Sequence, residues 1–154
     1  MEGNKQIIEY LNLRLAEELT AVNQYIVHAE MCDNWGYKKL HESIKKRAIQ
    51  EMKHAERIIE RILFLEGTPN VSKLNQINIG KNVEAQLLSD YEAEKSAVKA
   101  YNDSIGLAAE KGDNGTRELF KSNLQEEEKD IDWIEAQLDQ IKQMGIQNYL
   151  SDQL

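Results

Sequence analysis

Apolar residues recur at helical spacing along four long segments of the chain, and this periodicity predicts an all-α fold. Each segment would form a helix about 40 Å long. Helices of similar length that each carry one apolar stripe can bury it by packing side by side, so we expect a four-helix bundle. The segments run from about Lys5 to Cys32, about Lys38 to Glu66, about Val83 to Lys111, and about Thr116 to Met144.

The connections between these segments predict the topology. The breaks at 34–36 and 112–115 are short, so the helices on either side should pack antiparallel. The stretch from Gly67 to Gly80 shows no firm period and is long enough to run back along the bundle as one long crossover. The tail from Gln147 to Leu154 would add one or two helical turns. A chain of 154 residues is expected to form a single domain spanning 1–154.

The two halves of the chain share one pattern, offset by 76 residues. The inward-facing positions of the first two helices match those of the last two, which predicts a helical hairpin used twice. The matching pairs include Leu11 and Leu87, Val22 and Val98, Tyr25 and Tyr101, Ile44 and Phe120, and Ile58 and Ile134.

A glutamate interrupts the middle of each apolar stripe. Glu18 and Glu94 are 76 residues apart, and so are Glu51 and Glu127. A single glutamate in such a position usually reaches the edge of the core and water. Four related by a repeat should lie at one depth, where each ionised, unpaired carboxylate costs several kcal/mol. Two divalent cations would neutralise them, so we predict a dinuclear metal site.

Two further residues extend this prediction. Glu51 and His54 have the spacing that places both side chains on one helix face. A lone histidine near a core is more often structural, but its place beside Glu51 favours a ligand. Oxygen-rich ligation with one imidazole suits iron or manganese. The expected site has Glu51 and Glu127 as bridging ligands, Glu18 and Glu94 as terminal ligands, His54 on one metal, and Asp130, which occupies the matching position, as a candidate on the other.

Tyr25 lies on the same stripe as Glu18. Near a metal site it could donate a hydrogen bond or an electron. A core tyrosine with a satisfied hydroxyl group explains it equally well.

Bulk properties exclude several functions. The net charge of −8 and the lack of a basic tail argue against nucleic acid as a partner and favour cations. No apolar run approaches the roughly 20 residues that cross a membrane. The single Cys32 rules out an internal disulfide. Because the first residues lead into a charged amphipathic segment, we expect no signal peptide and a cytoplasmic location.

Short motifs spread over essentially the whole chain point to one family. They are Asn23-Gln24-Tyr25, His28-Ala29, Asn34-Trp35-Gly36, Glu51-Met52-Lys53-His54-Ala55, Arg61 to Gly67, Asn78-Ile79-Gly80, Ile131-Asp132-Trp133 and Asn148-Tyr149-Leu150. In these motifs the sequence resembles bacterioferritin, the haem-containing branch of the ferritins. The resemblance implies oxidation of Fe(II) by dioxygen or peroxide and storage of the product as mineral in a 24-subunit shell of two-fold dimers. It also implies a ferredoxin-like reductant for iron release and a short fifth helix after Gly145.

Met52 follows a predicted metal ligand and should face away from the bundle centre. With Ile49, Ile59 and Leu63 it forms a second apolar face, and such a face usually marks a subunit interface. Periodicity supports the interface alone. The resemblance adds haem b, bound at a two-fold axis by Met52 from each of two subunits.

Two departures from the family pattern leave alternatives open. The family usually has histidine where this chain has Asp130, so the second metal could bind more loosely. An interior iron site of the family would fall at Lys46 and Gln50, neither of which is a plausible ligand. A haem-binding subunit with an impaired centre, working beside a second subunit type, is therefore the alternative function. A rubrerythrin-like protein is disfavoured because no Cys-x-x-Cys pair exists, and a DNA-protecting mini-ferritin because the chain is acidic.

Overall fold

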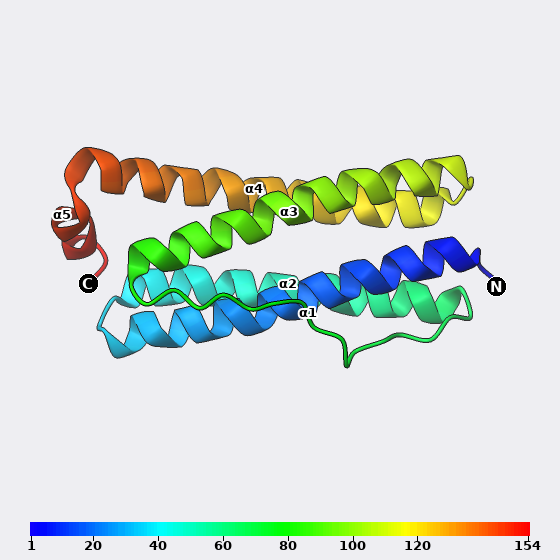
Figure 1. The fold of residues 1–154 in the computed structure, drawn as a ribbon, viewed down its shortest axis with the longest axis horizontal. Helices are drawn as coiled ribbons and strands as arrows, with labels where there is room; N and C mark the ends of the chain where they lie inside the picture. Colours follow the sequence, from blue (N-terminus) through cyan, green and yellow to red (C-terminus); the bar gives the residue numbers. More distant parts are fainter.

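The computed structural model describes residues 1–154 and is all-helical, as predicted. Four long helices lie along one common direction, and a short fifth helix lies across one end of the bundle (Figure 1). None of them combines the length and apolar composition that crossing a membrane requires. The helices are α1 (Lys5–Asn34), α2 (Lys38–Phe64), α3 (Val83–Glu110), α4 (Asn114–Met144) and α5 (Ile146–Ser151).

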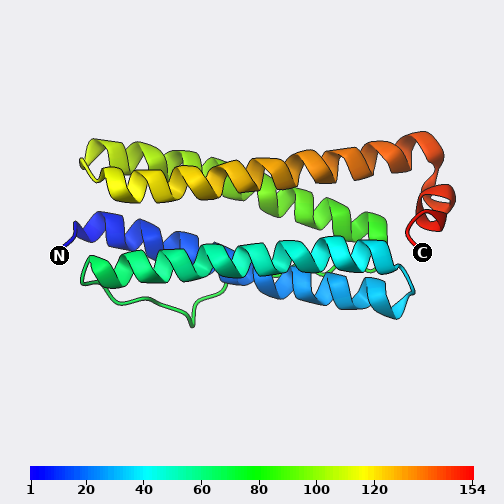
Figure 2. The same cartoon turned by 180° about the vertical axis from the view of Figure 1, so that it is seen from behind.

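The bundle consists of two antiparallel hairpins, α1 with α2 and α3 with α4. Seen from behind, α2 and α4 lie in front and the long connection passes on the far side (Figure 2). This is the predicted topology with one long crossover and a short C-terminal helix.

The 76-residue repeat extends to the C-terminal ends of α1 and α3. α1 and α3 end at Asn34 and Glu110, which are 76 residues apart. Each is followed by a glycine in the left-handed region, Gly36 with φ 87° and Gly112 with φ 69°. A residue with a Cβ adopts that conformation only with strain, which explains why both hairpin turns carry glycine.

The end of α2 differs from the prediction. The helix was expected to continue to Glu66, but it ends at Phe64. Glu66 itself adopts the left-handed conformation, with φ 62°, and the Gly67 amide donates to the Ile62 carbonyl at 2.9 Å. Gly67 does not supply the left-handed conformation. It allows close packing against α1, where a Cβ at position 67 would lie 2.7 Å from Cγ2 of Ile8.

The crossover, residues 65–82, is held against α1 by side chains on one helix face. The hydroxyl of Thr20 accepts from the Asn75 amide at 2.8 Å, and Oε1 of Gln24 accepts from the Asn78 amide at 3.1 Å. One turn further along α1, Nε2 of His28 accepts from the Gly80 amide at 3.0 Å. These contacts satisfy backbone donors that have no helical partner. The segment therefore runs along the bundle between α1 and α3 (Figure 1).

The core is divided into two apolar clusters, one toward each end of the bundle. Leu15 and Tyr101 belong to the first cluster, and Tyr25 and Ala48 to the second. The predicted glutamates lie between them along every helix, so a polar layer crosses the middle of the bundle. Some predicted core residues are only partly buried, namely Val22, Tyr91, Val98, Ile131 and Leu138.

Candidate metal centre

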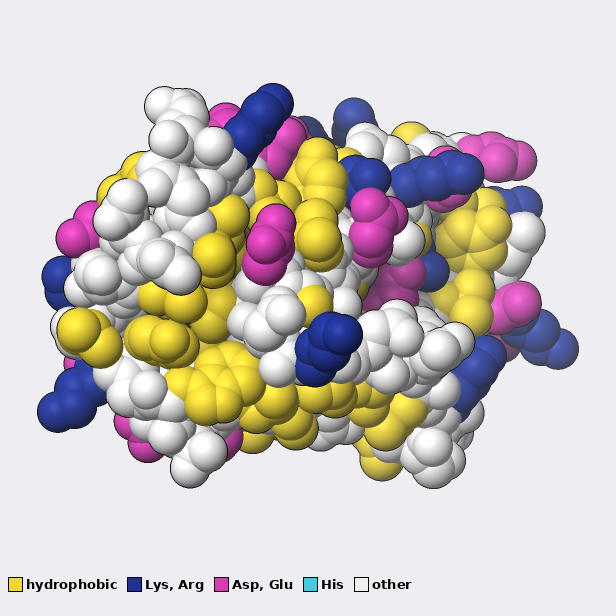
Figure 3. Space-filling model, turned by 60° about the vertical axis from the view of Figure 1, so that its left-hand side comes forward, with side chains coloured by type: hydrophobic (Ala, Val, Ile, Leu, Met, Phe, Trp, Pro, Cys, Tyr) yellow, Lys and Arg dark blue, Asp and Glu magenta, His cyan; other side chains and the backbone are white.

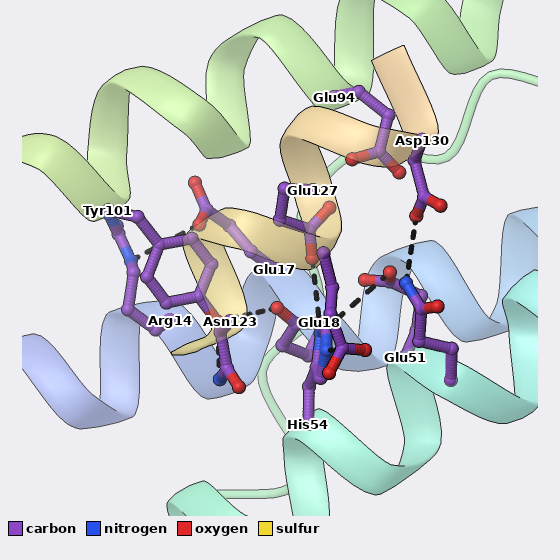
Figure 4. Close-up of polar contacts among 12 residues, drawn as sticks. Arg14, Glu17, Glu18, Glu51, His54, Glu94, Tyr101, Asn123, Glu127 and Asp130 are labelled. Carbon is purple, nitrogen blue, oxygen red and sulfur yellow. Dashed lines mark hydrogen bonds and ion pairs between the residues drawn. The ribbon is translucent and has the colours of Figure 1, made fainter. Parts of the chain in front are cut away.

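Six potential donors converge in the polar layer from all four long helices (Figure 4). All six are at most 4% exposed, because each projects from the inward stripe of its helix. They are Glu18 from α1, Glu51 and His54 from α2, Glu94 from α3, and Glu127 and Asp130 from α4.

These donors form two overlapping groups. In each group, one donor atom per residue lies within 4.8 Å of the others. Glu51 and Glu127 belong to both groups, so the geometry is that of two adjacent sites sharing two carboxylates. The first group adds Glu18 and His54, and the second adds Glu94 and Asp130.

Each of the four glutamates offers this centre one buried oxygen atom that accepts no hydrogen bond. A buried polar atom without a partner costs free energy and is rare in folded proteins. Four such atoms in one layer are what a cation would satisfy, and the donor set therefore fits a metal pair. The atoms are Oε2 of Glu18, Oε1 of Glu51, Oε2 of Glu94 and Oε2 of Glu127.

Burial shifts the acidities in the metal-free protein. It raises the pKa of Glu51 and of Glu127 well above the usual range, and the neighbouring carboxylates add to the shift. Burial also raises the pKa of Glu94 to about 7. For Glu18 burial acts in the same direction, but the nearby Glu51 and His54 side chains outweigh it and lower the pKa. Protons thus partly take the place of cations.

His54 is surrounded by carboxylates on both sides of its ring. Nδ1 lies 3.2 Å from Oε1 of Glu127 and 3.4 Å from Oε2 of Glu18. Nε2 lies 2.9 Å from Oε2 of Glu126. Burial lowers the pKa of His54, but Glu18 and Glu126 outweigh it and raise the pKa overall. Sequence reasoning missed Glu126, because one more glutamate beside Glu127 carries no distinguishing signal.

Two tyrosines contact the centre in a symmetrical way. Tyr25 on α1 donates its hydroxyl hydrogen bond to Glu94 on α3. Tyr101 on α3 donates to Oε1 of Glu18 on α1 at 2.5 Å. Burial, followed by the nearby carboxylates, raises both tyrosine pKa values well above the usual range, so both hydroxyls stay protonated. Tyr25 was predicted near the site; Tyr101 was missed, although the repeat pairs it with Tyr25.

Asp130 lies in the second group with its two oxygens already engaged. Oδ1 pairs with Arg47 of α2, and Oδ2 accepts from Nε2 of Gln50 at 3.1 Å. Burial raises the pKa of Asp130, and Arg47 partly offsets this. Gln50 thus contacts the centre, while Lys46 is exposed.

A cavity of about 570 Å³ connects the centre with the surface between α1, α3 and the crossover. Its inner end is formed by the four glutamates, and its outer part includes Glu17, Gln76 and Glu92. A polar, acidic passage of this kind admits a hydrated cation more readily than an anion.

Met52 lies outside the bundle core, 40% exposed. Ile49 and Leu63 on α2 and Ile26 on α1 are also exposed, while Ile59 is half-buried.

A second exposed apolar group at the end of α1 includes Val27 and Trp35. Hydrophobic side chains gather on the face near the α1–α2 turn and α5 (Figure 3). Contiguous exposed apolar side chains are typical of surfaces that bind a partner.

Comparisons with known proteins give a consistent result. The model of the ferritin-like domain family matches residues 8–144. The bacterioferritin of Mycolicibacterium paratuberculosis is 38% identical over 149 residues, which cover 97% of this chain and 94% of that protein. The bacterioferritin of Rhodobacter capsulatus is 38% identical over 149 residues, covering 97% and 92%. That of Streptomyces coelicolor is 38% identical over 151 residues, covering 98% and 90%.

Proposed function

Because the chain belongs to the ferritin-like domain family and, within it, to the bacterioferritins, we propose that it is a ferroxidase that oxidises Fe(II) and stores the Fe(III) product as mineral. The observation that carries this proposal is the pair of overlapping donor groups that share Glu51 and Glu127, with unpaired oxygens between them. We assign bridging roles to these two glutamates and terminal roles to Glu18, Glu94 and His54. Asp130 is the candidate ligand of the second metal.

Iron is the substrate, and a bound pair supplies two electrons at one place. With dioxygen as oxidant, two Fe(II) ions lose one electron each, and dioxygen takes both electrons and two protons to form hydrogen peroxide. With peroxide as oxidant, the same two electrons and two protons yield two water molecules. Holding two ions side by side allows the oxidant to be reduced in one encounter.

The protein contributes ligand orientation and proton control. Binding at Nδ1 requires His54 to lose a proton there, while the Nε2–H hydrogen bond to Glu126 would fix the ring. Cation binding would also displace protons from Glu51, Glu94 and Glu127. Tyr25 would keep Glu94 oriented by its hydrogen bond and stand ready as an electron donor.

We further propose that the protein assembles as a 24-subunit shell of two-fold dimers in the cytoplasm and binds haem b between two copies of Met52. The exposed apolar surface around Met52 supports the interface, and a thioether there offers an axial ligand. Residues 1–154 would then act as one ferritin-like domain, with a ferredoxin-like protein as reductant for iron release.

A second candidate is a haem-binding subunit with an impaired centre that functions in a shell shared with another subunit type. The engagement of Asp130 by Arg47 and Gln50 favours it, because those contacts occupy a candidate ligand. Full ferroxidase activity of the protein on its own would exclude this candidate.

Stopped-flow oxidation of Fe(II) by the purified, metal-free protein tests the proposal. Glu51→Ala and Glu127→Ala should each abolish the fast phase, since each removes a ligand that both metals share. Glu128→Ala, an exposed neighbour on α4, is the matched control and should oxidise Fe(II) at the starting rate. Unchanged initial rates in both Glu51 and Glu127 variants would overturn the assignment.

A further inference from the structure

A cationic side chain pairs with one member of the second donor group, and none pairs with the first group. Arg47 pairs with Oδ1 of Asp130, and Gln50 donates to Oδ2 of the same carboxylate at 3.1 Å. The two α2 residues are three positions apart and therefore project from one face of the helix. In Figure 4 the Asp130 carboxylate points from α4 toward α2, the helix that carries Arg47 and Gln50.

Arg47 is held in place by a further contact. Its guanidinium carbon lies 4.3 Å from the ring centroid of Trp133, and its side chain is only 14% exposed. Trp133 follows Asp130 by three residues on α4, so both partners of Arg47 lie on one face of that helix. A guanidinium stacked on an aromatic ring and paired with a carboxylate is a built contact between α2 and α4, unlike a solvated surface arginine.

The charges of the two groups differ accordingly. No arginine or lysine pairs with Glu18, Glu51, His54 or Glu127. Arg47 brings a guanidinium cation to the second group. It acts against a second cation in two ways: it repels the incoming charge, and it competes for the oxygens of Asp130.

We propose that Arg47 and Gln50 form a clasp that withholds the Asp130 carboxylate from the second cation, so that the two sites bind cations with unequal affinity. The clasp residues set the affinity of the second site without touching the first. This inference rests on the proposed dinuclear centre and assigns Arg47 and Gln50 as positioning residues for it.

Cobalt(II) titration of the metal-free, assembled protein tests the clasp without any turnover. Calorimetry and the visible absorption of bound cobalt(II) would resolve one tight and one weaker site per subunit in the starting protein. Arg47→Met keeps the aliphatic stem and removes the charge. It should lower the dissociation constant of the second site by about tenfold or more, equivalent to about 1.4 kcal/mol per tenfold. The first site should stay within about twofold.

Four further variants make the result specific. Lys46→Met removes the same charge from an exposed neighbour and should leave both sites unchanged. Gln50→Leu removes one donor and should give a smaller gain at the second site. Arg47→Met combined with Asp130→Asn should lose most of the gain, since the released carboxylate is then absent and only the relief of charge repulsion remains. Arg47→Gln serves in place of Arg47→Met if the latter does not assemble.

The possible failures are distinguishable. Two equal sites in the starting protein, or an unchanged or weaker second site in Arg47→Met and Arg47→Gln, would overturn the clasp. So would a double variant that keeps the full gain, because charge repulsion alone would then explain it. Fewer than two bound cobalt(II) ions per subunit in both the starting protein and Arg47→Met would instead overturn the dinuclear centre.

Discussion

Several carboxylates of the polar layer lie in surroundings that disfavour their charged form when no cation is present. Glu51, Glu94 and Glu127 all have a raised pKa because burial disfavours the charged form. The folded protein therefore keeps protons that the unfolded chain releases above pH 4.5, the ordinary glutamate value. Folding takes up protons, and stability must fall as these protons are removed.

The metal-free protein should consequently lose stability as the pH rises from about 4.5 through about 7 and beyond, by up to about 1.4 kcal/mol per pH unit for each proton. His54, whose pKa is raised, acts in the same direction, while the lowered pKa of Glu18 acts only at lower pH. Thermal unfolding at pH 6 and pH 8 measures the effect. Glu94→Gln should reduce the slope and the exposed control Glu128→Gln should not; a metal-free protein equally stable at both pH values would contradict this account.

The residues of the centre differ in how far the sequence reveals them. The burial of the four glutamates follows from helical spacing and the repeat, and the structure confirms it; their roles as ligands stay a prediction. Arg47 and Glu126 could not be found, because their direction depends on how α2 is rotated against α4. Helical spacing alone leaves that rotation undetermined at the edge of a stripe.

The N-terminal cap of α4 connects the α3–α4 turn to α2 of the other hairpin. Asp113 caps α4 by accepting from the Thr116 amide at 3.0 Å, and it also accepts from Nη2 of Arg61 on α2 at 2.9 Å. The hydroxyl of Thr116 donates to Oδ2 of Asp113 at 2.7 Å. These hydrogen bonds lower the pKa of Asp113, although burial alone would raise it. One residue thus joins the turn between α3 and α4 to the neighbouring hairpin.

Asp113→Ala should lower the free energy of unfolding by about 1 kcal/mol, the usual cost of a lost N-cap, and slightly more because Arg61 loses a partner. Asp113→Asn keeps an acceptor and should lose less. Thermal unfolding of the assembled variants provides the comparison, with the exposed Asp103→Ala as control. Equal melting temperatures for Asp113→Ala and Asp103→Ala would rule out the cap as a stabilising element.

The elements themselves were largely predictable. Periodicity placed every long helix, and the glycines at 36 and 112 marked two of the turns. α2 ends at Phe64, slightly before the approximate predicted end at Glu66. Glu66 adopts a conformation that normally favours glycine, while the adjacent Gly67 is required for close packing on Ile8. A sequence pattern does not distinguish these two reasons for a glycine.

At the scale of the whole molecule, the exposed apolar surface is the main unexplained property of a single chain. Met52→Leu conserves volume and hydrophobicity, so assembly should survive with a cost below about 1.5 kcal/mol. Haem should be lost, because leucine has no lone pair to offer iron. Visible absorption after haem reconstitution measures this, with Met144→Leu at the end of α4 as matched control. Full haem content with unchanged axial-ligand bands in Met52→Leu would limit Met52 to interface packing.

The dinuclear centre is the central claim, and anomalous diffraction tests it most directly. Crystals of the metal-free protein would be soaked anaerobically with Fe(II) and measured at the iron absorption edge. We predict two anomalous peaks per subunit, both in contact with Glu51 and Glu127, one beside Glu18 and His54 and the other beside Glu94. A polar layer without iron, or with iron bound only outside the four glutamates, would contradict the account.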